Sequence, residues 1–368
     1  GLQTQVANDH SSSLPEPLAT HQTREASASP GITLSPIQTA DTTQGWNGLV
    51  LLTGSGSSYN VLSTYNFLTG HYRKLAESST TMLFDGVGSY GQNMLYHVEQ
   101  NGRTLYYTLN QLPTTGFFYG LDEENALNAI WMPDNLHVLI ATPYAGVIMV
   151  DTRTGQSRTF LPYLKTTGLK FYRDGYLYFL GNSDRTADML FRINVESGVV
   201  QQVTGRSAGG DFWLSPDGMT IYYKSAGPEG EDGVYAASSD GSSSEVIRPD
   251  GQPIGYGLDD SLVIMRQVNH TFEVVQLGAT PAQDRVLFSD VAPGAVSLCN
   301  PSFAPRTICD TTNIALAPYG HALVVIASYP DGSRKAWSDD LTTGRHALMM
   351  KPSEDTAMMV PGWDRIAA

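Results

Sequence analysis

The chain has 368 residues, with 36 acidic against 22 basic side chains and a formal net charge of −14. This balance argues against nucleic-acid binding, because a protein that grips phosphates needs a basic surface to release counterions. With 41% hydrophobic residues the chain can bury a large core, yet it lacks the run of roughly 20 apolar residues of a membrane helix, so we expect no transmembrane segment in this chain.

The first 45 residues are predicted to form an arm. They contain thirteen Ser or Thr and no aromatic residue, so alone they bury too little apolar surface to offset their ordering entropy. Within the arm, Ile32 and Leu34 alternate as one face of a strand would, and Ile37 follows them. We predict these three residues as anchors that add a strand to a blade edge. An edge on a neighbouring copy would give head-to-tail assembly, and an edge on the same chain would only wrap the arm around it.

From Trp46 onward, a turn followed by an apolar strand recurs along the chain. The turn residues are separated by 44, 40, 43, 42 and 60 positions, and they are Tyr90, Asp134, Asp174, Asp217, Asp259 and Tyr319. A second series of turns ends in glycine with the same period, at Gly70, Gly155, Gly198, Gly241 and Gly344. A period near 43 residues with four strands per unit indicates a β-propeller blade.

The second strand of each predicted blade can be counted along residues 46–368. The seven segments are 48–53, 93–98, 136–142, 175–181, 219–225, 261–267 and 321–328. The first of them has no inner strand before it, whereas TAMMVPGW at 356–363 has the pattern of an inner strand with nothing after it. We therefore predict an all-β, seven-bladed β-propeller of four-stranded blades, closed by the C-terminal strand, with an extended N-terminal arm. EENALNAIW at 123–131 is the nearest candidate helix, and it fits an inner strand equally well.

The single long interval of 60 positions contains an insertion at about residues 291–311. Cys299 and Cys309, the only cysteines, lie within it and lack the spacing of a zinc site. We predict that they form a disulfide, which would indicate an oxidising compartment, and the alternative is two free buried thiols.

The turns SPDG at 215–218, MPDN at 132–135 and YRDG at 172–175, with DTRTGQ at 151–156 and NVESGV at 194–199, resemble the repeats of TolB-type and WD40-like propellers. The resemblance covers roughly residues 46–363. It implies the propeller fold and no particular function, since propellers carry many activities. In such turns Asp and Gly shape the backbone, Asp by accepting bonds from amides and Gly by taking positive φ.

A search of the sequence for reactive motifs predicts no catalytic residue, no metal ligand and no cofactor. None of the eight histidines forms a metal-binding pair at helical spacing, and we expect packing or turn roles for His97, His137 and His321. TGSGSS at 53–58 satisfies neither a nucleophile-elbow nor a phosphate-loop pattern, and PEGEDG at 228–233 lacks the alternating ligands of a calcium loop.

We therefore expect a secreted or cell-surface protein that is not an enzyme and acts as a structural or interaction module. Its partner would be protein, in particular copies of itself, and donation of the arm to a neighbouring subunit would build a filament. Two alternatives remain: an enzyme or ligand binder of the lactonase or lyase type at the channel mouth, or the sensor ectodomain of a membrane protein.

Overall fold

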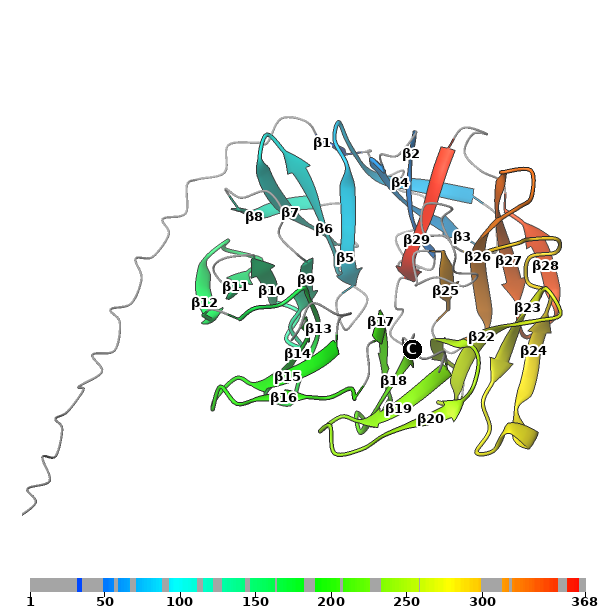
Figure 1. Cartoon of the computed structure of the whole chain (residues 1–368). Coiled ribbons are helices and arrows are strands. Elements are labelled where there is room, and N and C mark those ends of the chain that lie inside the picture. The colour runs from blue at the N-terminus through cyan, green and yellow to red at the C-terminus, as the bar shows by residue number, and fades with distance from the viewer. Residues whose placement is uncertain are drawn as a thin grey trace, which may run out of the picture.

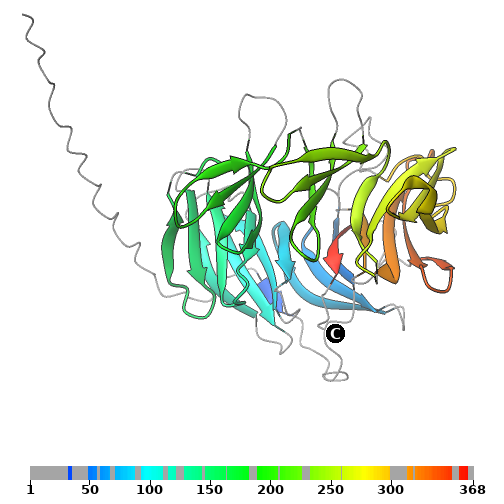
Figure 2. The same ribbon diagram turned by 90° about the horizontal axis from the view of Figure 1, so that it is seen from below.

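The computed structural model describes residues 32–34, 49–55, 59–66, 71–87, 93–110, 115–121, 128–142, 146–162, 164–181, 189–205, 208–225, 233–257, 259–298, 313–317, 320–349 and 356–363. Within these ranges the strands form seven antiparallel sheets around a common centre (Figure 1), and Figure 2 shows the same ring from below. The predicted all-β, seven-bladed propeller is confirmed. Blade 1 is the sheet that contains β2, and blades 2 to 7 follow in chain order.

In each blade, neighbouring strands are antiparallel. Their order runs from an inner strand at the centre of the ring to an outer strand at its rim. Blade 1 consists of β29 (Thr356–Trp363), β2 (Leu49–Ser55), β3 (Val61–Asn66), β4 (His71–Ser78) and β1 (Ile32–Leu34). Blade 2 consists of β5 (Met82–Val87), β6 (Asn93–Gln100), β7 (Arg103–Asn110) and β8 (Thr115–Leu121). Blade 3 consists of β9 (Asn128–Trp131), β10 (His137–Thr142), β11 (Gly146–Asp151) and β12 (Ser157–Leu161). Blade 4 consists of β13 (Gly168–Arg173), β14 (Tyr176–Gly181), β15 (Met189–Asn194) and β16 (Val200–Gln202).

The remaining blades repeat this order. Blade 5 consists of β17 (Ala208–Leu214), β18 (Thr220–Ser225), β19 (Gly233–Ser238) and β20 (Ser244–Arg248). Blade 6 consists of β21 (Gln252–Tyr256), β22 (Leu262–Val268), β23 (Thr271–Gln276) and β24 (Arg285–Ser289), with a 3₁₀ turn at Pro281–Gln283 before its last strand. Blade 7 consists of β25 (Ile314–Leu316), β26 (Ala322–Ser328), β27 (Arg334–Asp340) and β28 (Arg345–Leu348). None of the helices in the described ranges has the length and apolar character of a membrane-spanning segment.

The hydrophobic core is divided into layers between neighbouring blades. In β6, Met94 and Tyr96 pack with Leu62 of blade 1, whereas Leu95 packs with Val138 of blade 3. Successive side chains of a strand point to opposite faces, so a second strand with neighbours on both faces needs apolar residues at nearly every position. This demand explains why the apolar runs that recur in the sequence are the second strands of the blades. Each second strand begins and ends within two residues of its predicted position.

The inner strands carry an irregularity that the sequence analysis did not predict. The pairing of β5 with β6 skips Asp85, that of β13 with β14 skips Lys170, and that of β21 with β22 skips Ile254. Each is an extra residue in one strand, a β-bulge, which bends the strand and re-aims the side chain. The described end of EENALNAIW, Asn128–Trp131, is the inner strand β9, whereas residues 123–127 lie outside the described residues.

The ring is closed by the C-terminal strand, as predicted. β29 pairs with β2 from Leu49 opposite Trp363 to Ser55 opposite Thr356, and it forms the inner strand of blade 1. The inner edge of β2 is thereby paired. In the predicted insertion, Ser297 bridges Ser328 of β26, while Cys299 and Cys309 lie outside the described residues, so their disulfide stays a prediction.

Candidate interaction edge

Blade 1 carries a fifth strand at its outer edge. β1 pairs antiparallel with β4, with Ile32 opposite Ser78, Thr33 opposite Glu77 and Leu34 opposite Ala76 (Figure 1). The other six sheets of the described chain have four strands each. A segment of the predicted arm is therefore seated on the rim of its own chain, at the edge of a blade.

The hydrogen-bonding side of β4 follows from one printed contact. The Ser78 amide donates to the Asn60 carbonyl at 2.9 Å, which lies on the β3 side of the strand. Successive residues of an antiparallel strand turn their N–H and C=O groups to opposite sides. The backbone groups of Glu77 therefore face β1, and Thr33 is the residue that exchanges hydrogen bonds with it.

The end of β4 that lies beside β1 contains several buried residues. In β4, Leu75 is 4% exposed, Ala76 0% and Ser78 5%. The outer strands of blades 4 to 7 instead each expose an apolar side chain, namely Val200 at 49%, Val246 at 55%, Val286 at 44% and Leu348 at 53%. Burial at an outer strand does not require a fifth strand, however, because Phe118 in blade 2 and Leu161 in blade 3 are each only 7% exposed.

The upstream part of β4 is charged. Arg73 and Lys74 are exposed, and Lys74 Nζ lies 2.7 Å from Glu77 Oε2. Both partners of this ion pair are more than two-fifths exposed, so it contributes at most about 1 kcal/mol to stability. Charges along an outer strand are a common guard against uncontrolled edge pairing. In the described part of the chain, β1 covers only the last three positions of the eight-residue β4.

The predicted anchors are partly placed by the structure. Ile32 and Leu34 lie in β1, opposite the buried Ser78 and Ala76, whereas Ile37 lies outside the described residues. That these residues anchor an interaction stays a prediction.

His97, one of the three histidines for which packing or turn roles were predicted, is buried beside an aspartate toward the centre of the ring. His97 Nδ1 lies 2.6 Å from Asp85 Oδ2, and both side chains are at most 4% exposed. Burial lowers the pKa of His97, but the Asp85 carboxylate outweighs it and raises that pKa above its usual value. Asp85 Oδ1 also accepts a bond from the Ala129 amide of blade 3 at 3.3 Å. The bulge in β5 therefore places a carboxylate that joins two blades.

A neutral side chain forms the corresponding link between blades 3 and 4. Asn128 donates from Nδ2 to the Leu169 carbonyl and accepts from the Leu169 amide at Oδ1, both at 2.7 Å. These two bonds satisfy the amide and the carbonyl of Leu169, which lies next to the bulge in β13. These inner polar residues thus fasten neighbouring blades to one another.

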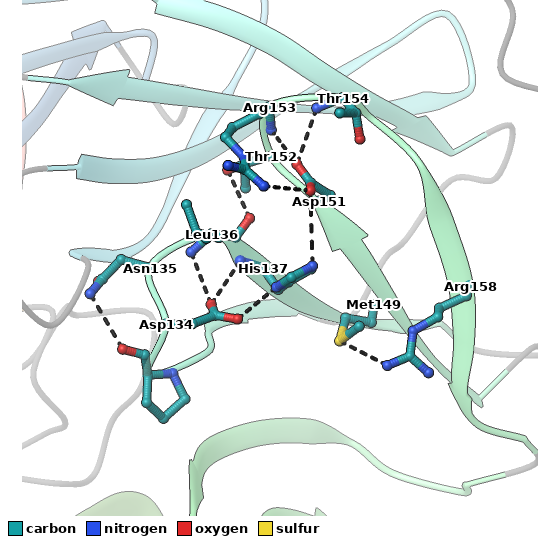
Figure 3. A network of polar contacts seen from close by, with 11 residues as sticks. Asp134, Asn135, Leu136, His137, Met149, Asp151, Thr152, Arg153, Thr154 and Arg158 are labelled. Carbon is teal, nitrogen blue, oxygen red and sulfur yellow. Dashed lines mark hydrogen bonds and ion pairs between the residues drawn. The ribbon is translucent and has the colours of Figure 1, made fainter.

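The turn aspartates make the bonds that the sequence analysis expected of them. Asp134 Oδ1 accepts from the amides of Leu136 and His137 at 2.9 and 3.0 Å, and its Oδ2 lies 2.6 Å from His137 Nδ1 (Figure 3). Partial burial opposes ionisation, but the bonds from His137 and the amides lower the pKa of Asp134. In the facing turn, the Arg153 guanidinium lowers the pKa of Asp151 to about 2. His137 therefore has a turn role.

Within the described ranges, no group of three or more His, Cys, Asp or Glu residues is gathered as a metal ion would require. The acidic segment at 228–233 is described only at Gly233, and Gly56 to Ser58 of the TGSGSS segment lie outside the described residues. Among the described residues, the edge of β4 is where a segment of the predicted arm pairs with a blade, and we take it as the candidate functional site.

Comparisons with known proteins give the fold. No model of a known protein family and no curated protein sequence matches the chain. Among solved structures, oligogalacturonate lyase from Vibrio parahaemolyticus is similar at 12% identity and a TM-score of 0.53, over 83% of this chain and 86% of that one. A puromycin-hydrolysing peptidase from Mycobacterium tuberculosis is similar at 13% identity and a TM-score of 0.54, over 86% of this chain and 55% of that one. TolB from Acinetobacter baumannii is similar at 11% identity and a TM-score of 0.46, over 84% and 82%. The two neighbours with TM-scores above 0.5 show the propeller fold that the resemblance in the turns implied.

These neighbours overturn the prediction that the chain is not an enzyme. That prediction took a propeller without a recognisable reactive motif as evidence against catalysis. A lyase and a peptidase that share the fold show that the step does not hold, although identities of 12 and 13% transfer neither activity to this chain.

Proposed function

We propose that this chain is an interaction module that binds an extended polypeptide segment by strand addition at the outer edge of β4, outside the cell or at its surface. The partner is a further copy of the chain, which donates its own Ile32–Leu34. The pairing of β1 with β4 carries the proposal, because it is an example of the recognition that assembly would use.

Exchange between copies needs no new contact. The ladder of β1 on β4 is the same whether the two strands belong to one chain or to two, and only the path of the connecting residues 35–48 differs. Reciprocal exchange between two copies gives a closed dimer, whereas donation from each copy to the next gives an open filament.

Cysteine pairing across the ladder tests the exchange. Ile32 and Ser78 are directly opposite and, by the alternation of the ladder, form a non-hydrogen-bonded pair whose Cα atoms lie about 4.5 Å apart, which suits a disulfide. An Ile32→Cys variant is mixed with a Ser78→Cys variant and oxidised mildly at rising concentration. We expect a covalent dimer whose linkage joins positions 32 and 78, identified by mass spectrometry.

Two controls fix the interpretation. Ile32→Cys mixed with Arg73→Cys places the second thiol five positions along β4, about 17 Å away, and should give no dimer above the wild-type background from Cys299 and Cys309. The double variant Ile32→Cys/Ser78→Cys reports the pairing within one chain. Linkage only within the double variant, and none in the mixture up to about 1 mM, would rule out exchange between copies.

A further inference from the structure

We infer that β1, seated on its own blade, is an autoinhibitory strap that keeps the acceptor edge of β4 closed to incoming strands. This inference rests on the proposed function and names the regulation of the same site. In the described structure the acceptor position is already filled by residues of the same chain, so a neighbour's segment must displace them.

The strap is held weakly by its own contacts. β1 has three residues, and in the ladder only Thr33 faces Glu77 with its hydrogen-bonding groups. The same three residues on a separate molecule bind more weakly, because their few bonds must then also offset the loss of overall motion. The covalent connection of β1 to blade 1 therefore strengthens its hold on β4.

The connection has a suitable length. Leu34 lies opposite Ala76, which lies opposite Leu62, which lies opposite Leu52 in β2. β1 is thus three strand spacings from β2, and Leu49 is three residues from Leu52, so the ends to be joined are about 17 Å apart. The 14 residues between Leu34 and Leu49 can reach about 50 Å at full extension, which is more than enough to join these ends.

A short tether that can reach its site gives an effective concentration in the millimolar range. At micromolar protein, an identical segment on another molecule competes against roughly a thousandfold excess of the tethered one. Assembly through β4 therefore starts only when the strap is released or when copies are crowded together. The chain is thereby kept from polymerising at low concentration without any change in the acceptor itself.

The substitution Thr33→Pro tests the strap. Proline removes the amide that Thr33 presents to Glu77 and should open the edge, whereas Thr33→Val keeps the amide and the branched side chain. The probe is a fluorescently labelled peptide with the sequence of residues 30–40, titrated into full-length wild type and both variants. We expect it to bind Thr33→Pro at least about tenfold more tightly than wild type or Thr33→Val.

Hydrogen exchange supplies a second readout that needs no peptide. The Glu77 amide is predicted to exchange at least about tenfold faster in Thr33→Pro than in the other two proteins, because among the described strands it is β1 that faces this amide. Equal peptide affinity for all three proteins, or equal Glu77 exchange, would overturn the strap and leave strand addition intact. Peptide binding to none of them up to about 1 mM, with faster Glu77 exchange in Thr33→Pro, would instead refute the proposed function, and the inference would fall with it.

Discussion

Asp339 in β27 has a carboxyl group with no exposed surface, and among the described residues its one hydrogen-bonding partner is His346 Nδ1. Its other oxygen, Oδ2, is buried without a partner in the described structure. The His346 ring stacks on Trp337 with centroids 4.3 Å apart and lies 5.8 Å from the Phe288 ring of blade 6. Burial raises the pKa of Asp339 from 3.8 to about 6, although the bond from His346 acts in the opposite direction.

This raised pKa predicts a pH dependence with a definite sign. The folded state holds the Asp339 proton more tightly than the unfolded state, so the associated stability is fully present below about pH 4 and is lost as the pH rises through 6. Relative to Asp339→Asn, wild type should lose up to about 3 kcal/mol in its free energy of unfolding between pH 4 and 7. Urea denaturation of both proteins across this range measures the difference, and a flat or rising difference would contradict the assignment.

Asp284 shows the opposite way of burying a carboxylate. Arg248 donates to it from Nε at 2.8 Å and from Nη2 at 2.6 Å, and the Gly278 amide donates at 2.9 Å. The bond from Arg248 is the main cause that lowers the pKa of Asp284 below its usual value. A buried pair with its bonds satisfied tolerates charge, whereas Asp339, with one oxygen unpaired, favours the proton.

At the scale of the elements, the sequence predicted the features that recur in every blade, which are the turns and the second strands. Asp134 and Asp217 head turns in which their side chains bond amides, and such turns need the same residue types each time. The second strands were visible because both of their faces are buried. The blade count and the closure by residues 356–363 followed from these two signals.

Structural features that occur only once in the chain could not be predicted from a repeat. The bulge at Asp85 and its contacts with His97 and Ala129 depend on residues 12 and 44 positions apart, and no local pattern marks them. The alternation of Ile32 and Leu34 identified a strand, but it carried no information about which edge would accept it or on which molecule. Those choices depend on long-range pairing and on the length of the connection.

Two glycines at equivalent turn positions differ in what they require: both have a positive φ, but only one also lacks space for a Cβ atom. Gly155 and Gly198 have φ of +69° and +71°, a conformation that disfavours any side chain by about 1–2 kcal/mol. A Cβ at Gly155 would in addition lie 2.5 Å from the Phe118 carbonyl of blade 2, whereas at Gly198 nothing lies within 4 Å. Gly155→Ala should therefore destabilise the fold by at least about 1 kcal/mol more than Gly198→Ala. Chemical denaturation compares the two, and equal losses would show that blades 2 and 3 are not packed as described.

At the scale of the whole molecule, closure of the ring rests on β29. Removing residues 356–368 takes away the inner strand of blade 1 and exposes the edge of β2. We expect this deletion to abolish a cooperative thermal transition or to lower its midpoint by more than about 10 °C. Deletion of residues 364–368 alone, which spares β29, is the matched control. A truncated ring that melts like the control would show that the C-terminal strand is not a stabilising closure.

The same joint has a consequence for how the protein is made. Blade 1 takes its strands from residues 32–34, 49–78 and 356–363, so its first strands are synthesised long before the strand that completes it. Six blades can form before that strand is available, and blade 1 is completed last. Until then a nascent chain exposes the unpaired inner edge of β2, which chaperones or a neighbouring nascent chain can reach.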